Sequence, residues 1–171
     1  MKRIREMDKP AIAAVNGVAA GAGCSLALAC DLRVASDQAS FIEVFINVGL
    51  IPDSGSTYTL VRLVGVGKAM ELCCTGHKVD ATEALRLGIV NQMVPAAELE
   101  AATQKLAAKL ASLPGRAIAL TKRLLNQSLQ NDLSQQLEAE AFDQETAGKT
   151  ADHYEGVTAF LEKRKPNFQG K

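Results

Sequence analysis

An uncharged stretch at residues 11–30 constrains the fold more than any other feature of this 171-residue sequence. It is long enough to cross a bilayer as a helix, and basic residues precede it. However, Glu6 and Pro10 interrupt the passage from the basic N-terminus to the apolar stretch, which is unlike a signal sequence. Within the stretch, Asn16, the glycines and the many alanines contribute little free energy of membrane insertion. A buried strand, a glycine turn and a packed helix explain the same residues better. We therefore predict a soluble, cytoplasmic protein without a membrane partner.

The balance of charged residues argues against nucleic acid as a partner. Lys plus Arg and Asp plus Glu each number 19, which gives a formal net charge of +0. Proteins that bind nucleic acid normally carry a basic excess or stripe, so no nucleic-acid partner is expected. Hydrophobic residues make up 47% of the chain, enough for a packed core.

The cysteines indicate free thiols rather than a metal centre. None of them forms a C-x-x-C pair, and the two histidines do not supply a second ligand pair at zinc-finger spacing. We therefore expect buried, reduced thiols and no metal site. The residues concerned are Cys24, Cys30, Cys73, Cys74, His77 and His153.

Hydrophobic periodicity predicts an α/β part followed by a helical part. Short strands are expected at 11–15, 32–35, 40–43 with a continuation to 48, and 89–94. Helices are expected at 25–30, 58–64, 66–75 and 80–88, and then at 97–113, 116–129, 133–147 and 152–163. Because the composition shifts near residue 95, we assign 1–95 to a strand-turn-helix core and 96–171 to a helical region.

The glycine-rich turn Asn16–Cys24 is the first candidate for chemistry. Backbone N–H groups at a helix N-terminus lack intrahelical acceptors and carry the positive end of the helix dipole. Such a turn can cradle a phosphate or act as an oxyanion hole for a developing enolate. Its glycines fall as G-x-x-x-G-x-G, which is not the dinucleotide fingerprint. The alternative is that the glycines only allow close packing of helix on strand.

Asp53 is the second candidate, between Pro52 and Ser54-Gly55 just before a predicted helix. It is either the cap of that helix or a general base. In the second interpretation, apolar neighbours raise the pKa of its carboxyl group. The expected neighbours are Phe45, Ile46, Leu50 and Ile51. A third interpretation makes Ser25 or Cys24 a nucleophile with His77 or His153 as its base.

Taken together, these segments resemble the crotonase (enoyl-CoA hydratase/isomerase) superfamily. The resemblance is carried by Lys9–Gly17, the glycine turn, Cys30–Ala35, Gly49–Gly55 and the C-terminal Ala159–Phe168. It implies an α/β fold of the ClpP/crotonase type, a spiral core lacking its N-terminal part. It also implies a C-terminal helical region for trimerisation, and hence a trimer or a dimer of trimers.

The resemblance also implies roles for individual residues. Ala22 supplies an oxyanion N–H, Gly21 and Phe45 line the substrate site, and Asp53 is the catalytic acid. Phe160 and Lys163 match positions that line the CoA site of a neighbouring subunit. The expected substrate is an acyl-CoA, with no cofactor beyond its coenzyme A.

The resemblance favours isomerisation over hydration. The family's hydratases use two glutamates, and Ser25 and Phe45 stand at those positions. The remaining acid, Asp53, resembles the branch that includes the ring-epoxyphenylacetyl-CoA isomerases of phenylacetate degradation. Family members also carry a segment before the Lys-Pro strand, which holds first strands, a CoA loop and the other oxyanion N–H. The alternatives are a hydratase and a non-catalytic protein that retains the crotonase scaffold.

Overall fold

The structure, a computed structural model, describes residues 1–171, which divide into two compact units. The first unit contains Met1–Arg5 and Ala11–Lys105, and the second contains Glu6–Pro10 and Leu106–Lys171. The units divide within helix α5 (Leu99–Ala111), after the composition shift near residue 95.

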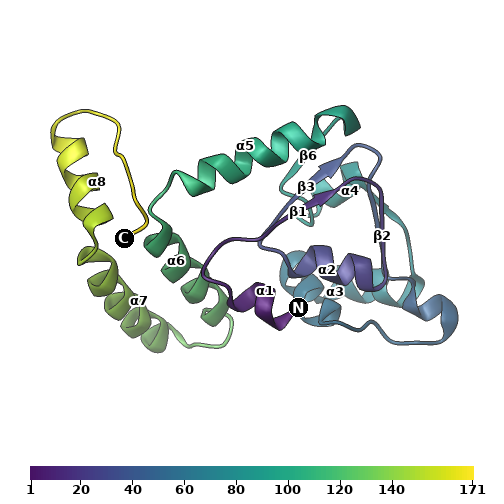
Figure 1. Cartoon of the computed structure of the whole chain (residues 1–171). Coiled ribbons are helices and arrows are strands. Elements are labelled where there is room, and N and C mark those ends of the chain that lie inside the picture. Colours follow the sequence, from purple (N-terminus) through teal and green to yellow (C-terminus); the bar gives the residue numbers. More distant parts are fainter. The chain divides into compact units, whose positions relative to one another are not determined.

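The first unit contains two small sheets, which form because the chain makes the same pair of short consecutive strands twice. Strand β1 (Ile12–Val15) is followed by β2 (Val18–Ala20), and β3 (Leu32–Ser36) is followed by β4 (Ser40–Ile42). β1 pairs in parallel with β3, and β2 pairs in parallel with β4. Successive turns of the chain therefore stack like turns of a spiral (Figure 1). β6 (Gln92–Val94) extends the first sheet in parallel, and β5 (Val79–Asp80) pairs antiparallel with β4.

Helices complete the core of the first unit. α2 (Ala22–Ala29) follows β2 directly, and α3 (Ser56–Thr75) packs against it with a kink at Gly65. α1 (Lys2–Glu6), α4 (Ala81–Arg86) and the 3-10 turn η2 (Ala96–Glu98) are shorter. Alanines, leucines and valines of α2, α3, α4 and the strands form the buried core, as the low aromatic content requires.

Residues 44–48 differ from the sequence prediction. We expected the strand at 40–43 to continue to Val48, but Val44–Val48 is a 3-10 helix, η1, that ends at Gly49 with φ 70°. Successive side chains of a strand point to opposite faces of the sheet, and in a sheet that packs on a core at least one of these faces is buried. Here only Phe45 is buried, whereas Ile46 and Val48 are exposed. The run therefore turns instead of extending the sheet.

Besides residues 6–10 and the end of α5, the second unit contains the C-terminal tail and three helices. They are α6 (Gly115–Gln127), α7 (Leu133–Gly148) and α8 (Ala151–Leu161). A capping box of Asp132 and Gln135 starts α7, and Arg123 of α6 forms an ion pair with the buried Asp143 of α7. The predicted α/β part followed by a helical part is confirmed. None of the helices is long and apolar enough to span a membrane.

Candidate active site

Gly21 shapes the turn that we predicted as an oxyanion hole. Its φ is 51°, and its N–H donates to the carbonyl of Ile42 at 3.0 Å. A Cβ at this position would lie 3.3 Å from Val44 Cγ2 and 3.6 Å from Phe45 Cζ. The positive φ disfavours any residue with a side chain, and a Cβ here would require Val44 to shift by a few tenths of an ångström.

Ala22 begins α2 immediately after this turn, and its side chain is exposed. The first N–H groups of a helix have no intrahelical acceptors. The first hydrogen bond within α2 runs from the Ser25 N–H to Gly21 O at 2.9 Å, so the N–H groups before Ser25 lie ahead of the helical bonding pattern. The turn can therefore offer the Ala22 N–H to a developing negative charge.

Asp53 lies in the loop between η1 and α3, and its side chain is exposed. It does not cap α3, because the capping residue is Gly55 and no side chain makes a capping bond there. The cap interpretation is therefore wrong. The expected apolar enclosure is also wrong, since Leu50 and Ile51 are 60% and 81% exposed. The carboxylate remains available for proton transfer.

The backbone of the Asp53 loop is held from two sides. The carbonyl of Asp53 accepts a hydrogen bond from the Ser56 N–H at 3.1 Å and another from Ser25 Oγ at 3.1 Å. The next residue, Ser54, has φ 53°, and Gly55 has φ 84°. Two consecutive left-handed residues turn the chain sharply into α3.

Ser25 and Cys24 do not have the surroundings of nucleophiles. Both are buried on α2, and the Ser25 hydroxyl is directed to the carbonyls of Gly21 and Asp53. Burial, followed by the charge of Glu43, raises the pKa of the Cys24 thiol far above its usual value. A thiol that remains protonated is a poor nucleophile. The exposed His77 makes no hydrogen bond to either residue.

Glu43 is a residue that sequence reasoning missed. It is 3% exposed, it accepts a hydrogen bond from Ser56 Oγ at 3.2 Å, and its Oε1 has no partner. It lines a cavity of about 10 Å³ that Cys24 and Leu28 also line. Burial raises the pKa of the Glu43 carboxyl above its ordinary value. Its signal in the sequence was a single acid within an otherwise uncharged run, residues 38–52.

The predicted substrate residues fall in both units. Phe45 is buried beneath Gly21, in the same unit as Ala22 and Asp53. Phe160 and Lys163 belong to the second unit. The Phe160 side chain, on α8, is 82% exposed, and Lys163 follows that helix with a positive φ of 55°.

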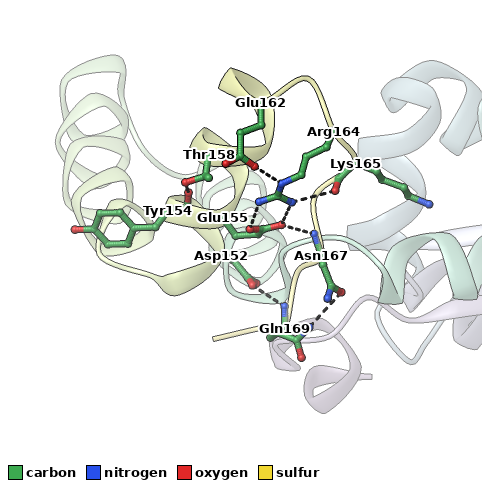
Figure 2. Close-up of polar contacts among 9 residues, drawn as sticks. All are labelled: Asp152, Tyr154, Glu155, Thr158, Glu162, Arg164, Lys165, Asn167 and Gln169. Carbon is green, nitrogen blue, oxygen red and sulfur yellow. Dashed lines mark hydrogen bonds and ion pairs between the residues drawn. The ribbon is translucent and has the colours of Figure 1, made fainter.

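The C-terminal tail folds back along α8 next to these two residues. Arg164 pairs with Glu155 and Glu162, and the N–H groups of Asn167 and Gln169 donate to Glu155 and Asp152 (Figure 2). The chain direction just after Lys163 is therefore fixed by charged contacts.

The first unit thus contains the two groups that proton transfer next to a thioester requires. These are an exposed carboxylate, Asp53, and the N–H groups at the start of α2. No group of three or more His, Cys, Asp or Glu side chains is placed to hold a metal ion.

Comparison with known proteins identifies a family. The sequence model of the family described as enoyl-CoA hydratase/isomerase matches residues 1–171. A 1,2-epoxyphenylacetyl-CoA isomerase of Escherichia coli (strain K12) is 43% identical over 171 residues, covering 100% of this chain and 65% of the relative. A crotonyl-CoA hydratase of Syntrophomonas wolfei is 42% identical over 168 residues, covering 98% of this chain and 65% of the relative.

A solved structure of an enoyl-CoA hydratase has the same fold as this chain. An enoyl-CoA hydratase from Bacillus anthracis superposes with a TM-score of 0.96 at 39% identity, over 99% of this chain and 66% of that chain. The chain therefore spans just under two thirds of the length of the proteins it matches. The spiral seen in the first unit is the crotonase fold that the sequence predicted.

Proposed function

The chain belongs to the enoyl-CoA hydratase/isomerase family, and from this premise we propose that it moves the double bond of an unsaturated acyl-CoA, with Asp53 as the proton carrier. The substrate is a CoA thioester, and no cofactor takes part beyond the CoA of the substrate.

The proposed reaction uses one base and one oxyanion donor. The Asp53 carboxylate removes a proton from the α carbon of a β,γ-unsaturated thioester. The electron pair of that C–H bond moves toward the thioester and forms a dienolate. The dienolate oxygen accepts a hydrogen bond from the Ala22 N–H. The Asp53 carboxylic acid then returns the proton to the γ carbon, which leaves the double bond between α and β and restores the carboxylate.

The observation that carries this proposal is the single exposed acid of the site. Water addition needs one group to activate water and another to manage the proton at the α carbon. By the resemblance, Ser25 and Phe45 occupy the positions of the two glutamates of the family's hydratases. Neither can replace a carboxylate, and both are buried. The other nearby acid, Glu43, is buried as well. Asp53 alone suits the proton shuttle of an isomerase better than hydration.

Hydration is the second candidate because one of the relatives is described as a crotonyl-CoA hydratase at 42% identity. A non-catalytic acyl-CoA-binding protein is the third. The proposed partner in each case is an acyl-CoA, and the proposed assembly is a homo-oligomer, a trimer or a dimer of trimers. In it, Phe160 and Lys163 contact the CoA of a neighbouring copy. The exposure of Phe160 and Leu161, 82% and 73%, supports an intermolecular role for the end of α8.

The test is conversion of a β,γ-unsaturated acyl-CoA to its α,β isomer by the purified chain. We expect Asp53→Asn to lower turnover by about 10²- to 10⁴-fold, because the amide cannot accept the proton. Asp8→Asn serves as the matched control, since Asp8 is also an exposed aspartate but belongs to the second unit.

Three results would contradict parts of the proposal. Equal turnover in the wild type and Asp53→Asn would remove Asp53 from the mechanism. Formation of a 3-hydroxyacyl-CoA from an α,β-enoyl-CoA, at a rate exceeding isomerisation, would favour the hydratase. Binding of acyl-CoA without turnover, unaffected by Asp53→Asn, would favour the non-catalytic protein.

A further inference from the structure

The buried hydroxyl of Ser25 joins the two halves of the candidate site. Ser25 is 1% exposed, in the first turn of α2. Its Oγ lies 3.2 Å from the carbonyl oxygen of Gly21 and 3.1 Å from that of Asp53. Gly21 precedes the Ala22 N–H, and Asp53 carries the exposed carboxylate. One hydroxyl therefore contacts the backbone of both functional segments.

This contact is the single hydrogen bond between residues 51–55 and α2. The other hydrogen bonds of this segment are local, from the Ser56 N–H to Asp53 O and from residues Tyr58 and Thr59 to Gly55 O. Residues 53–55 are exposed, and two of them have a positive φ. The position of the loop relative to the oxyanion turn thus depends on Ser25.

The start of α3 has its own anchor behind the loop. Ser56 is fully buried, and its Oγ donates to Glu43 Oε2 at 3.2 Å. Glu43 immediately precedes η1, the element on which Gly21 packs. The Asp53 carbonyl is consequently held between Ser25 on one side and the Ser56–Glu43 pair on the other.

We propose that Ser25 is a positioning residue, which holds the Asp53 loop against the oxyanion turn by donating its hydrogen bond to the Asp53 carbonyl. The inference rests on the proposed function of Asp53. Productive geometry between a base and an oxyanion donor tolerates little displacement, and an error of about 1 Å can lower the rate about a hundredfold.

Ser25→Ala tests the tether without endangering the fold. Each carbonyl keeps its backbone donor in this variant, because Gly21 O still accepts the residue-25 N–H and Asp53 O still accepts the Ser56 N–H. No buried acceptor is left unsatisfied, so global stability should change little. Ser25→Thr keeps the hydroxyl and serves as the conservative variant. Ser112→Ala is the control, since the exposed Ser112 hydroxyl also donates to a carbonyl, that of Lys109.

The first measurement is amide hydrogen exchange, which does not depend on activity. We expect the Ser56, Tyr58 and Thr59 amides to exchange about two- to tenfold faster in Ser25→Ala, with the amides of β1 and β3 unchanged. Ser25→Thr and Ser112→Ala should retain the wild-type rates at these three amides. Wild-type exchange at these amides in Ser25→Ala would overturn the inference, whether or not the chain turns over acyl-CoA.

The second measurement is the isomerisation assay. We expect Ser25→Ala to lower kcat about ten- to a hundredfold with KM changed less than about twofold, and Ser25→Thr to restore most of kcat. Faster exchange with an unchanged kcat would overturn the positioning role. If Asp53→Asn leaves turnover unchanged, the proposed function fails, and the exchange data alone then decide whether Ser25 tethers the loop.

Discussion

Lys163 occupies a backbone position that glycine usually fills. Its N–H donates to Phe160 O at 3.2 Å, and the Arg164 N–H donates to Ala159 O at 3.0 Å. These two bonds form a Schellman motif at the end of α8, whose left-handed residue is normally glycine. Lys163 adopts φ 55° there. Strain of this kind collects at functional sites, which agrees with the CoA contact that we propose for Lys163.

Lys163→Gly should therefore stabilise the second unit while weakening acyl-CoA binding. Removing the side chain from a left-handed residue is expected to gain about 1 kcal/mol in the free energy of unfolding. Chemical denaturation measures this gain, and Lys165→Gly is the control because Lys165 has no positive φ. Equal changes in both variants would show that Lys163 is not strained. Unchanged binding in Lys163→Gly would remove it from the CoA site.

At the scale of elements, α8 and the tail are joined by charged contacts (Figure 2). Glu155 accepts hydrogen bonds from Arg164 at 2.7 and 2.8 Å and from the Asn167 N–H at 2.7 Å. The Arg164 guanidinium, above all, lowers the pKa of Glu155 to about 2. Asp152 continues the attachment by accepting from the N–H groups of Gln169 and Gly170. The segment after Lys163 follows α8 because two acids bind it.

We expect Glu155→Gln to loosen the tail from α8. The pKa of Glu155 is lower in the folded chain than its ordinary value of 4.5, so the contact is fully present above pH 4.5 and is lost as pH falls through about 2. Limited proteolysis near Lys165 should be faster in the variant at neutral pH. Glu138→Gln, at an exposed position of α7, is the control. Equal cleavage in both variants would contradict the attachment.

The helices and strands differ in how well the sequence alone predicted them. The four C-terminal helices were predicted within a few residues, because long amphipathic runs are local signals. η1 and the strands β2 and β5 were not predicted, and β2 lies within the segment expected to be only a glycine turn. Both strands depend on pairing with β4, which is distant in the chain. Asp53 and the glycine turn were candidates from the local sequence, and the resemblance supplied the roles expected of Ala22 and Gly21. Glu43 and the bonds of Ser25 were missed because burial and contact are tertiary properties.

For the whole molecule, the buried Glu43 links folding to pH. Burial raises the pKa of its carboxyl in the folded chain, and the charge of Asp53 acts in the same direction, whereas contacts with Cys24 and Ser56 lower it. The folded chain therefore binds this proton more tightly than the unfolded chain. The free energy of unfolding falls as pH rises from about 4.5, the unfolded value, through the raised pKa.

Glu43→Gln should remove this part of the pH dependence. An amide oxygen can still accept from Ser56 Oγ, but the side chain no longer becomes charged inside the core. We expect the variant to be more stable than the wild type at neutral pH, by about 1.4 kcal/mol for each pKa unit of the upward shift. The difference should vanish below pH 4.5, where the wild-type carboxyl is protonated in both states. Urea denaturation across this pH range measures it, with the exposed Glu100→Gln as control. A difference that is constant with pH would mean that Glu43 acts through packing rather than through its charge.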